Sequence, residues 1–181
     1  LNDRLLSILR NLLGSNIYYL HDTTVVQNNF VKPNTYSWHR DNPCRIIGKG
    51  PDWDKDEPYN VVSTITYLSP NEETGSGISV IPFSHKKTYA RTLSNILRIF
   101  HYKTKNIKLL KGIRDLIEKK ISVIIRTDPG DCAIFLCNLF HVGLPPRSLR
   151  RQSIQTRFGS AGKHAKNYIN YILKYRKGSD Y

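Results

Sequence analysis

Two histidines and one aspartate are spaced along the chain so that few folds can bring them together. His39 and Asp41 lie two residues apart, whereas His141 follows His39 by 102 positions. On an extended strand, residues i and i+2 project to the same side, so the first pair fits the end of one β-strand. His141 must then come from a different strand. We therefore expect a barrel-like β fold that places the two strand ends side by side.

These three side chains form a suitable ligand set for a metal ion. Two histidines and one carboxylate can occupy one face of an octahedral Fe(II) ion and leave the opposite face open, as in the facial triad of non-haem iron oxygenases. Arg151 follows His141 by ten positions. A guanidinium group binds a carboxylate through two parallel hydrogen bonds, so Arg151 suits the distal carboxylate of 2-oxoglutarate.

The His-x-Asp tripeptide is a weak signal by itself, because a histidine beside a solvated acid is an ordinary surface feature. Its surroundings make the signal more specific. A β-branched and polar run over residues 23–31 precedes it and predicts a strand. A strongly apolar run over residues 132–140 precedes His141, and the turn-forming segment 128–131 precedes that run. Both parts of the ligand set are therefore expected close to strands.

Several short segments follow one another in a characteristic order. They are Trp38-His39-Arg40-Asp41, Tyr67-Leu68-Ser69-Pro70, Thr74-Gly75-Ser76-Gly77, Val80-Ile81-Pro82-Phe83-Ser84-His85-Lys86, Pro129-Gly130-Asp131, His141-Val142-Gly143 and Arg151-Gln152-Ser153-Ile154. Together they resemble the phytanoyl-CoA dioxygenase-like family of Fe(II)/2-oxoglutarate-dependent oxygenases, over roughly residues 23–159. One departure is Phe83, which stands where the family usually has glycine.

The resemblance implies a mainly β fold with flanking helices around a double-stranded β-helix, which is a jelly-roll, cupin-like core. It also implies Fe(II) bound by His39, Asp41 and His141, 2-oxoglutarate held by Arg151, and O2 as the oxidant. The family arginine usually follows the distal histidine by eleven positions instead of ten. A one-residue deletion is therefore expected before Arg151, and Arg150 stays the alternative partner of 2-oxoglutarate.

The implied reaction is hydroxylation of a substrate C–H bond, with release of succinate and CO2. Halogenating relatives lack the carboxylate ligand, whereas Asp41 is present here. Two alternatives stay open. Arg151, Ser153, Gln155 and Arg157 alternate along the last predicted strand, so they are expected to project to one side, into the barrel interior. The spacing of Arg151 and Arg157 resembles the R-x-N-x-T-x-R motif of nucleic-acid demethylase oxygenases, although Ser153 and Gln155 replace its Asn and Thr. The second alternative is a non-catalytic, cupin-like module that binds an anion or nucleic acid; the intact ligand set argues against it.

The charge of the chain bears on its substrate. The formal net charge is +14, and residues 86–126 carry twelve Lys or Arg against two acids. Residues 147–177 carry nine basic residues and no acid. Such a surface is either a solvated face that maintains solubility or a field that attracts an anion. We expect a small-molecule substrate, and an anionic one if the basic surface serves to attract an anion. Nucleic acid is a less favoured partner.

The length of 181 residues predicts one domain, and the resemblance implies that residues 1–181 form a single oxygenase domain. Two amphipathic helices over 91–120 predict a basic helical insertion at about 88–121, and the Pro- and Gly-rich residues 42–60 predict a loop over the metal. Other expected elements are helices at 1–13 and 163–176, with Leu173 facing inward, and strands at 59–68, 122–125, 132–140 and 152–159.

The sequence also bears on the compartment. No apolar run approaches the roughly 18 residues that a membrane-spanning helix needs, so no transmembrane segment is expected. The three cysteines are odd in number and show no C-x-x-C spacing, and Cys132 and Cys137 lie on the apolar run, where buried free thiols are expected. Both observations favour a reducing, cytoplasmic location, which also suits Fe(II).

Overall fold

The computed structural model describes residues 2–27, 38–41, 60–75, 77–86, 116, 119–145, 147 and 151–175. Its helices are α1 (Asp3–Leu13), α2 (Asn71–Thr74) and α5 (Lys163–Tyr175). Its strands are β1 (Ile17–Gln27), β2 (Val61–Tyr67), β3 (Gly77–Val80), β4 (Val123–Arg126), β5 (Cys132–Leu136), β6 (His141–Gly143) and β7 (Gln152–Ser160).

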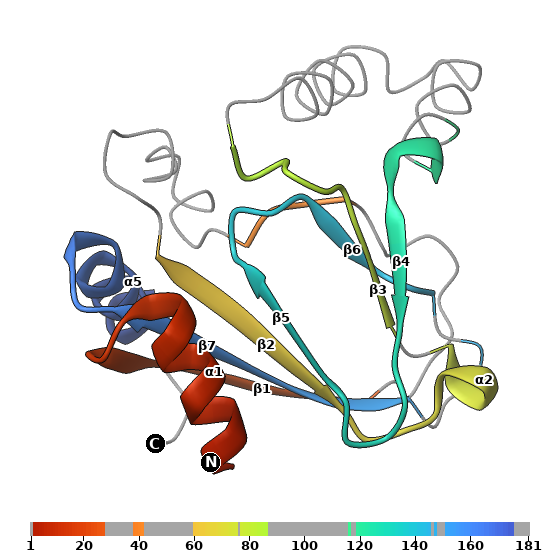
Figure 1. Cartoon of the computed structure of the whole chain (residues 1–181), viewed down its shortest axis with the longest axis horizontal. Coiled ribbons are helices and arrows are strands. Elements are labelled where there is room, and N and C mark those ends of the chain that lie inside the picture. The colour runs from red at the N-terminus through yellow and green to blue at the C-terminus, as the bar shows by residue number, and fades with distance from the viewer. Residues whose placement is uncertain are drawn as a thin grey trace.

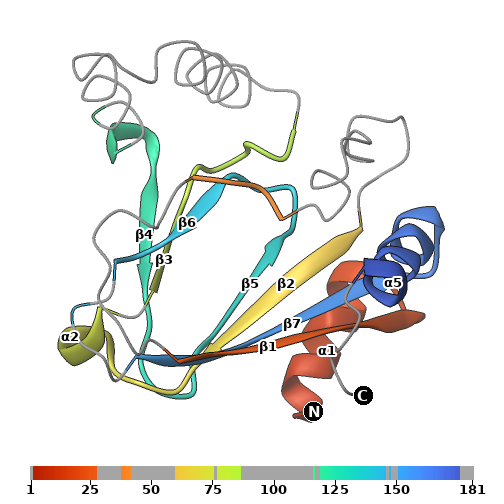
Figure 2. The same ribbon diagram turned by 180° about the vertical axis from the view of Figure 1, so that it is seen from behind.

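The strands form two antiparallel sheets that face each other, as Figures 1 and 2 show from opposite sides. One sheet has four strands in the order β1-β7-β2-β5, and the other has three in the order β4-β3-β6. Strands that are neighbours in a sheet are mostly distant in sequence, as the crossovers of a double-stranded β-helix require. The expected jelly-roll core with flanking helices is confirmed.

The four-stranded sheet is covered on both faces, which explains why β2 is buried along nearly its whole length. Alternate residues of a strand point to opposite faces. On the outer face, Val62 and Phe158 pack against Leu9 and Leu13 of α1. On the inner face, a cluster joins both sheets and contains Ile65, Tyr67, Ile78, Val80 and Phe135. The space between the sheets is therefore lined by Ile65 and Tyr67 of β2.

Helix α1 ends where the sequence predicts, because Gly14 adopts a φ of 89° and its N–H donates to the Arg10 carbonyl. A positive φ favours glycine, which has no Cβ to clash. Helix α5 packs through Ala165 and Ile169 against Leu20 and Val61. The expected inward position of Leu173 is wrong, because this side chain is 65% exposed. It lies near the end of α5, where the helix extends past the apolar cluster.

The apolar run 132–140 is not one strand as expected. Strand β5 ends at Leu136, the chain turns, and β6 begins at His141. The Leu139 N–H donates to the Leu136 carbonyl across this turn. Strand β5 belongs to the four-stranded sheet and β6 to the three-stranded sheet. The run is mostly apolar because it crosses the core from one sheet to the other.

Two expected segments fall wholly or largely outside the described residues. They are the loop 42–60 and the helical insertion at about 88–121, of which residues 116 and 119–121 are described and are helical. Arg150 is also outside them. The departure at Phe83 has a visible backbone setting, since this residue has a φ of 60° in the turn after β3. The same conformation would suit the glycine that is usual in the family.

Candidate metal centre and adjoining pocket

His39, Asp41 and His141 come together at one end of the space between the sheets. The N–H of His39 donates to the His141 carbonyl and the N–H of His141 donates to the His39 carbonyl, each at 2.9 Å. This pair of hydrogen bonds fixes segment 38–41 beside β6. The Asp41 N–H donates to the Cys137 carbonyl at 2.7 Å, which anchors the segment a second time. The backbone therefore places all three side chains before any metal binds.

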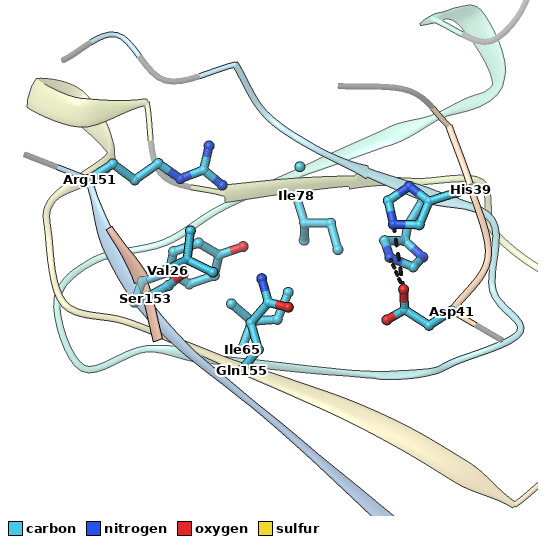
Figure 3. A pocket seen from close by; sticks show the side chains of 11 residues that line it. Val26, His39, Asp41, Ile65, Ile78, Arg151, Ser153 and Gln155 are labelled. Atoms are coloured by element: carbon cyan, nitrogen blue, oxygen red, sulfur yellow. Dashed lines mark ion pairs between the residues drawn. The ribbon is translucent and has the colours of Figure 1, made fainter. Parts of the chain in front are cut away.

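The distances among the three side chains suit a single bound cation. The Asp41 Oδ1 atom lies 3.5 Å from His39 Nε2 and 3.7 Å from His141 Nε2 (Figure 3). One ligand atom from each residue can be chosen so that all three lie within 4.8 Å of one another. Two donors about 2.1 Å from one ion lie about 3.0 Å apart at a right angle and about 3.4 Å apart at a tetrahedral angle. The distances of 3.5 Å and 3.7 Å from Asp41 Oδ1 slightly exceed these values, so small side-chain movements would bring the three donors to one ion.

The hydrogen bonding of His141 prepares its other nitrogen to bind a metal. The Nδ1 atom lies 2.8 Å from the Leu139 carbonyl oxygen, which accepts a hydrogen bond when Nδ1 is protonated. The lone pair is then on Nε2, the atom that faces Asp41. A backbone carbonyl commonly fixes the tautomer and ring orientation of a metal-binding histidine in this way. His141 therefore fits the donor chemistry of a metal ligand.

His141 is held neutral in the folded protein. Burial lowers the pKa of its imidazole from 6.5 to about 4; His39 and Arg157 also lower it, while Asp41 and the hydrogen bond to Leu139 oppose the shift. A neutral imidazole is the form that binds metal, because protonation removes the lone pair.

The stability of the metal-free protein is expected to decrease as the pH falls from about 6.5 to about 4. His141 must gain a proton there in the unfolded chain but not in the folded one, so the stabilisation is complete above pH 6.5 and is lost below it. The loss is roughly 3 kcal/mol from this residue. Urea unfolding at several pH values measures it, and His141→Asn should flatten the profile. An equally steep profile in this variant would contradict the assignment.

Asp41 is a partly buried carboxylate that stays ionised. Burial alone would raise the pKa of its carboxyl, but the hydrogen bond with His39 and the positive charge of Arg157 contribute to holding that pKa below its ordinary value. The Arg157 Nη2 atom donates to Asp41 Oδ2 at 3.1 Å. Sequence parity predicted that Arg157 faces inward but not that it reaches Asp41.

A cavity of about 150 Å³ extends from the three candidate ligands between the sheets. Its lining residues are Val26, His39, Asp41, Ile65, Tyr67, Ile78, His141, Gly143, Arg151, Ser153 and Gln155. Figure 3 shows Arg151 on the side opposite His39 and Asp41, with the Gln155 amide directed into the space between them. The cavity thus joins a candidate three-residue metal site to a guanidinium group. The expected inward parity of Arg151, Ser153 and Gln155 is confirmed.

Arg151 is 6% exposed and is held by main-chain carbonyls. Its Nη1 atom donates to the Leu144 carbonyl and its Nη2 atom lies 3.5 Å from the Gly77 carbonyl. Tyr67 lies nearby on the same wall, in register with Ser153. Burial raises the pKa of the Tyr67 hydroxyl to about 12, although the Arg151 charge opposes the shift. The Tyr67 hydroxyl is therefore neutral at physiological pH. Its position beside Arg151 depends on the register between β2 and β7, which sequence reasoning missed.

Gly77 leaves room for this arrangement. It has a φ of 143°, and a Cβ there would lie 2.6 Å from the Ile125 carbonyl oxygen and 2.9 Å from a methyl carbon of Leu144. We expect Gly77→Ala to destabilise the fold by roughly 1–3 kcal/mol because of the strained backbone and the clash. Thermal unfolding measures this loss. Gly130→Ala is the matched control, since Gly130 also has a positive φ but its Cβ would meet nothing within 4 Å. Equal losses in both variants would show that the contact at Gly77 is unimportant.

Comparisons with known proteins agree with this geometry. The sequence profile of the phytanoyl-CoA dioxygenase (PhyH) family matches residues 1–153. No curated protein matches the chain. Among solved structures, HygX from Streptomyces hygroscopicus with nickel and 2-oxoglutarate bound has a TM-score of 0.58 at 17% identity, covering 88% of this chain and 62% of that chain. EctD from S. alaskensis with bound Fe has a TM-score of 0.57 at 19% identity, covering 88% and 50%.

A third similar structure is a non-heme monooxygenase, the ThoJ–Ni complex, with a TM-score of 0.54 at 11% identity and coverage of 86% of this chain and 49% of that chain. At these identities the likeness concerns the fold. The chain covers between 31% and 65% of the length of similar solved structures. Within the described residues, no helix is both long and apolar enough to cross a membrane.

Proposed function

We propose that this chain, which belongs to the phytanoyl-CoA dioxygenase family, is an Fe(II)- and 2-oxoglutarate-dependent dioxygenase that hydroxylates a C–H bond of a small, anionic substrate. One observation carries the proposal: a possible three-residue metal site and a buried arginine line one cavity. The metal site would bind the reactive end of a 2-oxo acid, and the arginine would bind the other end.

His39, Asp41 and His141 would hold Fe(II) through two imidazole nitrogens and one carboxylate oxygen. Three facial ligands leave three of the six octahedral positions open, which is the number that a chelating 2-oxo acid and O2 need together. When bound, iron would activate O2, so that one oxygen atom enters succinate as 2-oxoglutarate loses CO2 and the other enters the substrate C–H bond. The chain supplies a neutral His141 and an ionised Asp41, so neither has to lose a proton at neutral pH.

Arg151 would bind the distal carboxylate of 2-oxoglutarate. Its guanidinium is buried and oriented by the carbonyls of Leu144 and Gly77, so little side-chain freedom remains to be lost on binding. Ser153 and Tyr67 add hydroxyl groups to the same wall of the cavity. The apolar walls formed by Ile65 and Ile78 would exclude water and strengthen the ion pair.

The substrate would be recognised outside this cavity. We propose a single domain over residues 1–181. Within it, our candidates for that role are the basic insertion at about 88–121 and the segment 42–60. Residues 86–126 carry twelve basic side chains against two acids, which favours an anionic metabolite or acyl-CoA. We assign the protein to the cytoplasm because the described cysteines, Cys132 and Cys137, are free, as in a reducing compartment.

The test is a screen of anionic metabolites and acyl-CoAs for stimulated succinate release with Fe(II), 2-oxoglutarate and O2. We expect a slow basal release that one class of compound accelerates. Stimulation by methylated single-stranded DNA or RNA alone would replace our assignment with a nucleic-acid demethylase. Absence of turnover together with absence of metal uptake would show that the chain is a binding module.

A further inference from the structure

The two oxygens of the Asp41 carboxylate have different partners. Oδ1 faces both imidazoles, at 3.5 Å from His39 and 3.7 Å from His141. Oδ2 accepts a hydrogen bond from Arg157 Nη2 at 3.1 Å. The side chains of Asp41 and Arg157 are only 14% and 10% exposed, so water competes little for this ion pair. One carboxylate oxygen is directed at the metal position and the other is occupied by a guanidinium group.

The sheet builds this contact through a row of three residues. Arg157 on β7 is in register with Ser63 on β2, and Ser63 is in register with Phe135 on β5. Ser63 is fully buried and small, so the long side chain of Arg157 has room on the inner face. Phe135 packs against His141, with ring centroids 4.7 Å apart. The row therefore supports both the carboxylate and the buried histidine of the metal site.

We propose that Arg157 is a positioning residue that restricts Asp41 to binding the metal through one oxygen. This inference rests on the proposed function, because it concerns the coordination of the metal that His39, Asp41 and His141 would hold. Arg157 does not touch the metal or the co-substrate in this role. It acts by engaging Oδ2 with a charge-assisted hydrogen bond, the stronger kind of hydrogen bond in proteins.

Counting coordination positions shows why one oxygen matters. Two imidazoles and a carboxylate bound through one oxygen fill three of six positions, whereas a chelating carboxylate would fill a fourth. A 2-oxo acid that binds through two atoms and an O2 molecule need three positions. If Asp41 chelated the metal, the co-substrate would have to displace one of its oxygens first. Arg157 thus keeps the third open position available.

Loss of Arg157 has two opposing effects on metal binding itself. The variant loses a partner that orients Asp41, but it also loses a positive charge close to the cation. We therefore expect the affinity for the metal alone to change little, and the affinity of the metal-loaded protein for 2-oxoglutarate to fall. A residue that only stabilised the fold would not separate these two affinities.

The experiment uses Co(II) as an oxygen-stable probe and compares wild type with Arg157→Met and Arg157→Lys. Titration calorimetry measures Co(II) affinity first and then 2-oxoglutarate affinity of the Co(II)-loaded protein. For Arg157→Met we expect Co(II) affinity within a few-fold of wild type and 2-oxoglutarate affinity roughly 10–100-fold weaker, the size of effect typical of residues that orient metal ligands. Lysine should restore part of the loss, because it can donate to Oδ2 but lacks the planar fork.

Arg126→Met is the matched control, because Arg126 is exposed at the end of β4 and its replacement removes the same charge elsewhere. Absorption of the Co(II) form gives a second readout, since the Arg157→Met spectrum before 2-oxoglutarate is added should indicate a higher coordination number than wild type. An unchanged spectrum and unchanged 2-oxoglutarate affinity in Arg157→Met would overturn the inference. If Arg157→Met does not fold, Arg157→Gln takes its place, because its shorter, uncharged side chain also removes the charge-assisted hydrogen bond to Oδ2, and wild-type values in that variant would overturn the inference. Wild type that binds no Co(II) would instead refute the proposed function.

Discussion

Replacing His141 with alanine is expected to abolish tight Fe(II) binding and all succinate formation. His141 is the most buried of the three proposed ligands, and its Nε2 already faces Asp41 with Nδ1 engaged by a carbonyl. If water replaced the imidazole of His141, only His39 and Asp41 would remain as protein ligands. Loss of a residue that merely orients a ligand costs roughly 10–100-fold in metal affinity, so loss of the ligand itself should cost at least that much. The variant should still fold, because the backbone bridge to His39 does not need the imidazole.

Anaerobic titration with Fe(II) and 2-oxoglutarate measures this effect. Wild type should develop a weak visible charge-transfer band, and His141→Ala and His39→Ala should not. His85→Ala is the matched control, since His85 lies in the turn after β3 and outside the set of three. A band that persists undiminished in both ligand variants would refute the metal site, whereas loss of the band in His85→Ala as well would point to a general effect on the fold.

Part of the candidate metal site was predictable because the rule behind that part is local. The i, i+2 spacing of His39 and Asp41 needs only an extended backbone, and that backbone is present at segment 38–41. The parity of Arg151, Ser153 and Gln155 needs only that β7 is a regular strand. Neither inference depends on how the sheets are arranged in space. The jelly-roll arrangement itself came from the family resemblance, since periodicity alone does not give a strand order.

The partners of these residues were not predictable, because they depend on register between strands far apart in sequence. The contact between Arg157 and Asp41 joins residues 116 positions apart. It requires both the pairing of β7 with β2 and the attachment of segment 38–41 to β6. The break between β5 and β6 was missed for a related reason. A chain that crosses a core between two sheets is as apolar as a strand buried on both faces, so hydrophobicity does not distinguish them.

Arg151→Ala is expected to weaken 2-oxoglutarate binding by roughly tenfold to a hundredfold while Fe(II) binding is retained. The bound carboxylate would lose a charge-assisted hydrogen-bonding partner inside a cavity with apolar walls, which costs about 1.5–3 kcal/mol, and ~1.4 kcal/mol corresponds to tenfold in affinity. Iron affinity should persist because Arg151 lies across the cavity from the metal ligands (Figure 3). Calorimetric titration of the Fe(II)-loaded protein with 2-oxoglutarate under anaerobic conditions measures the change.

Arg150→Ala is the matched control, and it also tests the placement of the one-residue deletion before Arg151. Neighbouring residues of an extended chain point to opposite faces, and Arg151 is the one that faces the cavity. Arg150→Ala should therefore leave 2-oxoglutarate affinity nearly unchanged. Arg151→Lys should recover only part of the loss, because an ammonium group supplies the charge without the two parallel hydrogen bonds of a guanidinium group. A large loss in Arg150→Ala with none in Arg151→Ala would assign the co-substrate to the other arginine, and the carbonyls of Gly77 and Leu144 would then hold Arg151 for a structural purpose alone.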